Sequence, residues 1–417
     1  MSEQQFEHLL DYLQKHAKEQ PDAIAIRQKQ LGLWRQWSWH KLFQKTQHYA
    51  VSLQQLGFQK GDQLLVLASP HIDVIALSFA VQTLAGTVQL FEAEFDFDHV
   101  ERLQQIKQQL SPQFILVDEF EQAKQLSQLK GNKPFIFYID DFSHVYDHFE
   151  NIISIAQLEA LIKQDDEHSI HLQHVTQNIA FNFVKVVDQH YLSAEFEHQN
   201  LILEAKSLIE KYQFDANEQA FIARAFSSVG HIRYLWSSWL VAGFTLNIPE
   251  SLETRDHDRK LIAPTLVLGT KQTFERVHSL IKSRLPSEKS WLFKAFQISL
   301  VESSSRSTLS VTQKIAYSVF KQVILAEIGF SRLKTALIVG EPISEESRSF
   351  YQALNIELQY WEDHTQWVET NIQNTNEFHS THLDLNKKNS SETYSLITDS
   401  IKTNPITGYS KVNPIFP

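Results

Sequence analysis

Along the first third of the chain, short apolar segments typical of strands alternate with segments whose apolar and polar positions are typical of helices. The continuous apolar character of strands buried on both faces is found in GDQLLVLAS (61–69), TVQLF (87–91), FILV (114–117) and PFIFYID (134–140). A mostly apolar stretch at 72–86 ends at a glycine, as helices commonly do. Similar apolar runs return at 264–269 and 335–340. The pattern predicts an α/β fold with mostly parallel sheets flanked by helices.

The stretch 178–201, NIAFNFVKVVDQHYLSAEFEHQNL, begins like a buried strand and ends at a helix. Nucleotide-binding enzymes use a strand, a connection and a helix to hold phosphate, because free backbone N–H groups at a helix start attract anions. Such a connection needs glycine for close backbone approach. The chain has no glycine between Gly131 and Gly230. We therefore predict a connection that has lost phosphate-binding chemistry.

Composition limits the kinds of binding partner and the cellular compartment that we expect for the chain. The formal net charge is −11 and no basic stripe is present, which argues against a nucleic-acid partner. The absence of cysteine excludes disulfides, thiolate metal sites and a cysteine nucleophile, and we expect a cytoplasmic protein. The first twenty residues predict an amphipathic helix and do not resemble a secretory signal. The most apolar later run, 235–248, is shorter than the ~20 residues that span a bilayer, so we expect no membrane span.

Several segments, taken in order, resemble the adenylate-forming (AMP-dependent synthetase and ligase) superfamily and, within it, the long-chain fatty acyl-coenzyme A synthetases. Residues 34–91 are similar to the family's tryptophan-rich opening module, and 226–251 to its Leu-Pro-Leu-x-His element and Ala-Gly turn. Residues 264–281 resemble P-T-x-x-x-G-V-P-R-x-F-E-R, and 330–358 resemble the strand, G-G-A-P-L turn and helix beside the adenine.

The resemblance implies a domain organisation. Residues 1–370 would form a degenerate AMP-binding N-terminal domain with two mostly parallel sheets flanked by helices. Residues 371–417 would be a tail or the remnant of a small, partial β-barrel subdomain. Because the sequence stops at Pro417, before the family's C-terminal domain with its catalytic lysine, we expect that domain to be absent.

The resemblance also locates the family's nucleotide-binding positions. Of the phosphate loop, only the final H-Q-N-L (198–201) matches, and Lys185 is either a remnant of it or a solvent-facing residue of a strand. The adenine turn corresponds to Gly340, Glu341 and Pro342. Thr365 is retained where the family contacts phosphate, but Gln366 replaces the glutamate that holds Mg²⁺. We therefore expect no bound cofactor, no metal and no catalytic residues.

An acyl pocket is the second implied site, with Gly230, His231 and Gly243 as candidate lining residues. The alternatives are a packed histidine at a helix start and glycines that only serve turns. Closely spaced histidines occur at 168, 171 and 174, and at 379 and 382. In a chain with 19 histidines we interpret them as chance clusters rather than a metal site.

Three functions fit these observations. The first is a pseudoenzyme that binds a protein partner as an accessory or regulatory protein, with a fatty acid or acyl chain as a further ligand. The second is an AMP-dependent fatty acyl-coenzyme A ligase or adenylation subunit completed by a separate C-terminal domain or partner chain. The third is a fatty-acid carrier or sensor. We expect that the chain is not itself a competent enzyme, although fold alone does not decide between them.

Overall fold

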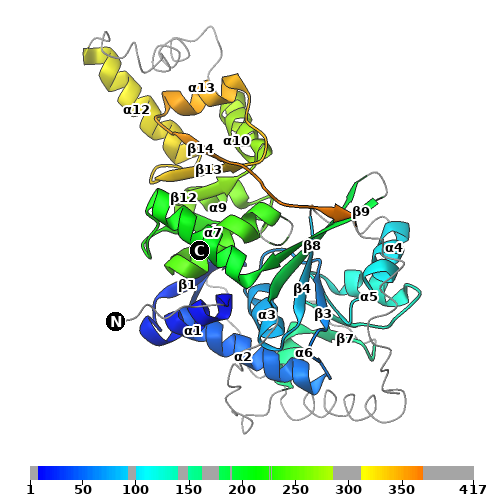
Figure 1. Cartoon of the computed structure of the whole chain (residues 1–417). Helices are drawn as coiled ribbons and strands as arrows, with labels where there is room; N and C mark the ends of the chain where they lie inside the picture. Colours follow the sequence, from blue (N-terminus) through cyan, green and yellow to red (C-terminus); the bar gives the residue numbers. More distant parts are fainter. Residues whose placement is uncertain are drawn as a thin grey trace, which may run out of the picture.

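The computed structural model describes residues 8–92, 100–139, 149–161, 178–187, 190–224, 226, 228–284 and 311–369. Two mainly parallel β-sheets flanked by helices make up this part (Figure 1). Each sheet contains strands that the apolar runs predicted, and the α/β fold with two mostly parallel sheets is confirmed.

The eight-stranded sheet has the order β15-β9-β8-β4-β3-β5-β6-β7. Neighbouring strands are parallel from β8 to β7, whereas β9 runs antiparallel to β8 and β15 antiparallel to β9. The strands are β3 (Gln63–Val66), β4 (Thr87–Phe91), β5 (Phe114–Val117), β6 (Phe135–Tyr138), β7 (Ile152–Ser154), β8 (Ile179–Val187), β9 (His190–Glu197) and β15 (Val368–Glu369).

The seven-stranded sheet has the order β14-β13-β12-β10-β11-β1-β2. The first strand of the chain pairs in parallel with β11, and Ile26 lies opposite Leu246. Only β2, which forms a hairpin with β1, is antiparallel. The strands are β1 (Ile24–Gln30), β2 (Leu33–Ser38), β10 (Gln219–Phe221), β11 (Thr245–Ile248), β12 (Leu266–Gly269), β13 (Thr335–Val339) and β14 (Leu358–Trp361).

Helices cover both sheets, and their ends follow local chemistry. The Ser344 side chain accepts a hydrogen bond from the Ser347 N–H at 3.3 Å, which caps the helix that begins at Glu345 as the sequence predicts. The helices are α1 (Leu9–Glu19), α2 (Trp39–Gln55), α3 (Ile72–Thr83), α4 (Val100–Leu110), α5 (Phe120–Gln128), α6 (Ile155–Ala160), α7 (His198–Tyr212), a π-helical turn η1 (His231–Trp236), α8 (Ser237–Ala242), α9 (Arg255–Ile262), α10 (Lys271–Arg284), α12 (Val311–Glu327) and α13 (Glu345–Ala353).

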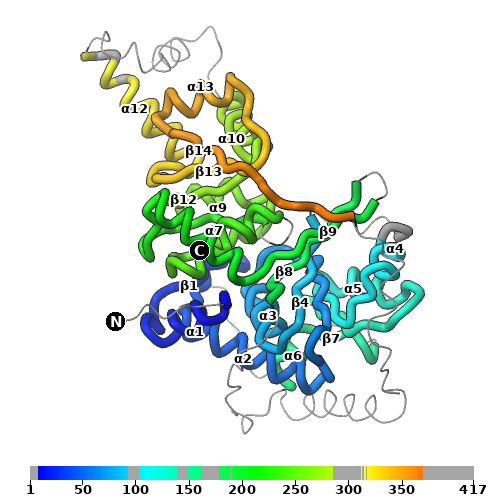
Figure 2. The backbone as a smooth tube through the Cα atoms, viewed as in Figure 1, coloured from blue at the N-terminus to red at the C-terminus, as the bar shows by residue number. Residues whose placement is uncertain are grey.

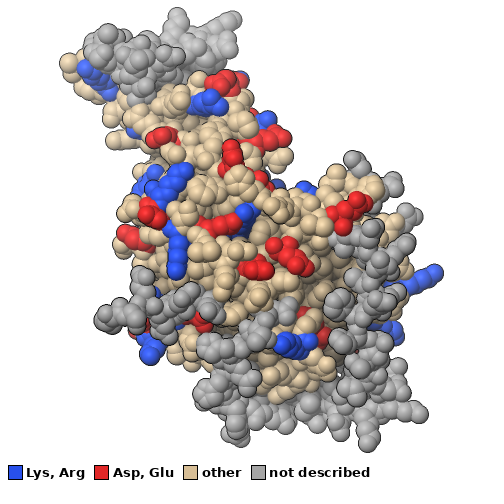
Figure 3. Space-filling view, viewed as in Figure 1, with Lys and Arg blue, Asp and Glu red and all other residues tan. Residues whose placement is uncertain are grey.

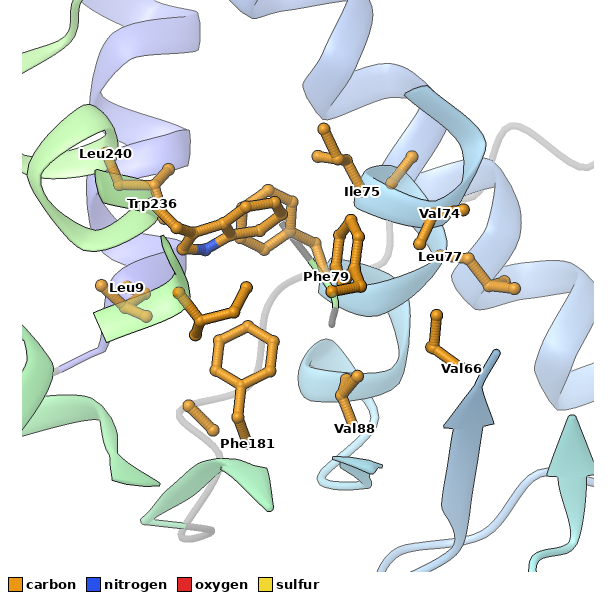
Figure 4. Close-up of a cluster of buried hydrophobic side chains, with 14 of the residues drawn as sticks. Leu9, Val66, Val74, Ile75, Leu77, Phe79, Val88, Phe181, Trp236 and Leu240 are labelled. Atoms are coloured by element: carbon orange, nitrogen blue, oxygen red, sulfur yellow. The ribbon is translucent and has the colours of Figure 1, made fainter. Parts of the chain in front are cut away.

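The core lies where α3 packs against η1 and α8. Every residue of α3 is buried, which its mostly apolar sequence predicts. Trp236 is fully buried, and its ring centroid lies 5.2 Å from that of Phe79 and 6.1 Å from that of Phe181 (Figure 4). Aromatic pairs at these separations add to the stability gained from burial.

One detail differs from the sequence prediction. The connection expected between β8 and α7 contains a complete strand, β9, because Ala194 and Phe196 alternate with exposed residues and pack in one core cluster, while Tyr191 is buried in another. Residues 371–417, where a barrel remnant was predicted, and the histidines at 168–174 and 379–382 lie outside the described residues, so the domain division at 370 stays a prediction.

A single segment connects the far edges of the two sheets. After β14, residues 362–367 cross to the eight-stranded sheet and enter β15 beside β9 (Figure 2). This crossing segment carries Thr365 and Gln366, two of the predicted nucleotide-binding positions. It therefore brings Thr365 and Gln366 to the place where the carboxyl ends of the strands of both sheets lie.

Candidate functional site

The candidate site lies where the carboxyl ends of the parallel strands of both sheets meet. In open α/β sheets, ligands bind outside these ends. The segments that follow β13 and β14 hold most of the predicted nucleotide-binding positions, Lys185 lies near the end of β8, and η1 contacts β12 beside them.

The hairpin β8–β9 occupies the place of the predicted phosphate connection. Its strands pair from Ile179 opposite Glu197, with a register shift before Phe181, up to Val187 opposite His190. The ammonium of Lys185 lies 3.9 Å from the centroid of the Trp367 ring in a cation–π contact. Lys185 is thus half-buried and packed on the crossing segment. It is not freely solvated, and it does not extend from a glycine-rich loop.

Arg233 of η1 holds the crossing segment in place. Its Nη1 donates to the Thr365 hydroxyl oxygen at 3.0 Å and lies 3.4 Å from Asp363 Oδ1. Its Nε donates to Glu204 Oε2 of α7 at 2.6 Å, and its Nη2 also contacts that carboxylate. Burial alone would lower the pKa of Arg233, but the hydrogen bonds and charge of Glu204 raise it overall. We call Arg233, Glu204, Asp363 and Thr365 the arginine cluster.

Asp363 is exposed on the crossing segment and contacts Thr365 directly. Asp363 Oδ1 accepts hydrogen bonds from the backbone N–H of Thr365 at 3.1 Å and from its hydroxyl. The retained threonine therefore already has two charged partners, Asp363 and Arg233, while Gln366 is exposed.

Glu92 is a second group at this edge that sequence reasoning missed. It directly follows β4, and its Oε2 accepts a hydrogen bond from the Val229 N–H at 2.7 Å. Burial, together with the charge of Asp363, raises the pKa of Glu92 to about 7, although the Val229 hydrogen bond and Lys185 oppose the shift. The carboxyl thus titrates near neutral pH. Its position after an apolar strand was the only signal in the sequence.

The predicted adenine turn follows β13. Gly340 has φ of +90° and open space where a Cβ would lie, so it serves a tight turn. Glu341 is exposed and lies 3.4 Å from the ammonium of Lys271, and Pro342 is exposed beside it. The structure thus places these three residues on the surface at the end of β13, on a different strand from Lys185.

The predicted acyl-pocket residues separate into two places. A Cβ on Gly230 would lie 3.2 Å from Val339 Cγ1, so this glycine permits close packing of η1 on β13. His231 is buried, and burial lowers its pKa to about 4 despite a hydrogen bond to the backbone of Leu268. Gly243 ends α8 with φ of +77°, at the opposite end from Gly230, and a Cβ there would lie 2.7 Å from His16 Cε1. Whether an acyl chain binds beside Gly230 and His231 stays a prediction.

Other surface features of the described residues are limited. The described part holds no group of three or more His, Asp or Glu side chains placed to bind a metal ion. No helix in the described ranges is long and apolar enough to cross a bilayer. On the face shown in Figure 3, acidic and basic side chains are interspersed.

Comparisons with known proteins agree with this architecture. Residues 13–166 match the family model of the AMP-binding enzyme. A hybrid PKS-NRPS synthetase, LUC5, from Fusarium sp is 32% identical over 114 residues, which are 27% of this chain and 3% of that protein.

Two solved structures illustrate the shared fold. The fatty acyl-adenylate ligase from L. pneumophila, in complex with acyl adenylate and pyrophosphate, has a TM-score of 0.54 at 15% identity over 84% of this chain and 53% of that one. The acyl-CoA synthetase of Brucella canis has a TM-score of 0.59 at 11% identity over 86% and 57%. The chain thus spans little more than half the length of these relatives. The resemblance to the adenylate-forming superfamily is confirmed, and the chain carries an AMP-binding, ligase-family fold.

Proposed function

We propose that this AMP-binding family protein does not itself activate carboxylic acids and acts as a cytoplasmic accessory or regulatory pseudoenzyme. The observation that carries the proposal is the arginine cluster, in which Arg233 and Asp363 already satisfy Thr365 at the edge where the family binds nucleotide. The pairing of β8 with β9 supports it, because this hairpin has no glycine-rich backbone to surround a phosphate.

The charges at this edge also oppose nucleotide binding. Glu92, Glu204 and Asp363 bring negative charge close to where the phosphates would have to lie. The two cations there are engaged, Arg233 with both carboxylates of the arginine cluster and Lys185 with an indole ring. ATP would have to break these contacts, and leaving a partly buried charge unpaired is costly.

The partner and the ligand form the finer part of the proposal. The L. pneumophila relative is described in complex with acyl adenylate. By analogy, we place an acyl chain beside Gly230 and His231, where η1 meets β13, and a protein partner on the surface of the chain. In this arrangement the protein would signal the presence of an acyl chain to its partner without converting the acyl chain chemically.

An adenylation subunit completed by another chain is the second candidate. One observation favours it: the strand ends of both sheets still converge on one edge. In that case the arginine cluster would have to open when the other chain docks.

Calorimetric titration with ATP and Mg²⁺ tests the first proposal. We expect no saturable heat at millimolar nucleotide. A dissociation constant in the range of ~1 μM to 1 mM, typical of enzyme substrates, would refute it. A Lys185→Met variant is the matched control, because any genuine phosphate contact from this lysine would disappear. ATP binding by the wild-type chain without fatty-acid-dependent pyrophosphate exchange would instead support the second candidate.

A further inference from the structure

A cavity outside the arginine cluster opens at the carboxyl ends of strands from both sheets. It has a volume of ≈ 330 Å³, within the range of small-molecule sites. Its walls come from the segments that follow β3, β4, β5, β10 and β11. In the sheet orders, these strands lie away from β9, β13 and β14, which flank the arginine cluster. None of its lining residues belongs to the arginine cluster or to the predicted nucleotide-binding positions.

The inner wall of the cavity is apolar. Four of its residues, each at most 3% exposed, are Val66, Phe91, Phe226 and Ile248. These side chains come from the strand ends of both sheets and the segments that follow them, so the cavity lies between the two sheets. Such a wall suits the hydrocarbon part of a small ligand.

Asp118 supplies the main polar group of the cavity. It follows β5, and its carboxylate accepts hydrogen bonds from the Ser69 N–H at 2.9 Å and the Ser69 hydroxyl at 2.8 Å. Within the described part of the chain, no basic side chain forms an ion pair with Asp118, although His71 acts on it at longer range and Glu119 repels it. A carboxylate has about four acceptor positions, so Asp118 can accept a further donor.

The burial of Asp118 and the charges of the lining together favour a cationic ligand. Desolvation raises the pKa of Asp118 despite the Ser69 hydrogen bonds, so a cation beside it would relieve the cost of its charge. Glu250 and Glu253 add negative charge to the lining, and Arg224 is the one basic residue of the lining. The lining thus carries three carboxylates against one guanidinium.

We propose that this cavity binds a small molecule with a primary ammonium group on an apolar body, the ammonium pairing with Asp118 and the body lying against Phe91 and Phe226. A seven-atom alkylamine matches a cavity of this size. The inference does not depend on the proposed function, because neither Asp118 nor the lining takes part in the arginine cluster.

The test is a calorimetric titration of the full chain with three probes of equal length: n-hexylamine, hexanoate and hexanol. We expect hexylamine to bind best. Asp118→Asn keeps an acceptor for Ser69 and should weaken hexylamine about tenfold or more, because it removes a charge-assisted hydrogen bond. Glu195→Gln, an exposed change on β9, is the control and should leave the affinity unchanged.

Two further measurements keep the test decisive if Asp118→Asn does not fold. Ala223→Leu enlarges a lining residue without altering charge and should abolish hexylamine binding. Hexylamine affinity of the wild-type chain should fall as the pH drops towards the raised pKa of Asp118. Tighter binding of hexanoate, equal affinity in a folded Asp118→Asn variant, or no hexylamine binding at 10 mM would each overturn the proposal.

Discussion

Replacing Glu92 by glutamine should stabilise the protein at alkaline pH and have little effect at acid pH. The ordinary pKa of a glutamate is 4.5, and burial raises that of Glu92 to about 7. The folded chain therefore retains a proton that the unfolded chain releases. The free energy of unfolding falls as the pH rises from about 4.5 to 7, because in this window the folded state binds more protons than the unfolded state.

The magnitude follows from the two pKa values. Each pH unit between them corresponds to ~1.4 kcal/mol, so an ionised Glu92 costs the folded state about 3 kcal/mol at pH 8. Glutamine keeps an oxygen that can accept the hydrogen bond from the Val229 N–H but carries no charge. Glu92→Gln should therefore exceed the wild-type free energy of unfolding by up to about 3 kcal/mol at pH 8 and by little at pH 5.

Urea unfolding followed by tryptophan fluorescence at pH 5, 6, 7 and 8 measures this difference. Other titrating groups, such as His231, occur in both proteins and cancel in the comparison. Glu195→Gln on β9 is the control, because its exposed side chain should give the same small change at each pH. If the difference between Glu92→Gln and wild type were the same at pH 5 and pH 8, the carboxyl would not be buried as described.

Further substitutions test packing. Trp236→Ala should lower the free energy of unfolding by about 3–5 kcal/mol, because it removes a fully buried indole where α3 meets η1. Urea unfolding measures this loss, and a loss below ~1 kcal/mol would contradict the close packing. Gly243→Ala and Gly340→Ala both place a side chain at positive φ, which costs about 1 kcal/mol. Gly243→Ala should cost a further ~1–3 kcal/mol through contact with His16, and equal melting temperatures for the two variants would contradict this.

The element types could be predicted because they depend on local pattern. The runs at 87–91 and 335–339 became buried strands since continuous apolar sequence is stable only when both faces are covered. The strand β9 was missed because its polar residues Glu195 and Glu197 alternate with the buried ones and made the segment look like a surface connection.

The arginine cluster could not be predicted from sequence. Glu204, Arg233 and Asp363 lie far apart along the chain, and each is an ordinary charged residue in its own segment. Their approach depends on the docking of the crossing segment against η1, a tertiary event without a local signature. The same applies to Glu92, whose titration is set by neighbours from three other elements.

The pairing of β1 with β11 has a consequence for the order of events during synthesis. The strands β3 to β7 are complete by residue 154, so their parallel array can assemble early. The hairpin β1–β2 leaves the ribosome first but finds its neighbour only after Leu246 has been made. At ~5–20 residues per second, the open edge of β1 waits on the order of ten seconds or more. An unpaired strand edge exposed for that time is a site for chaperones, and for aggregation when they are lacking.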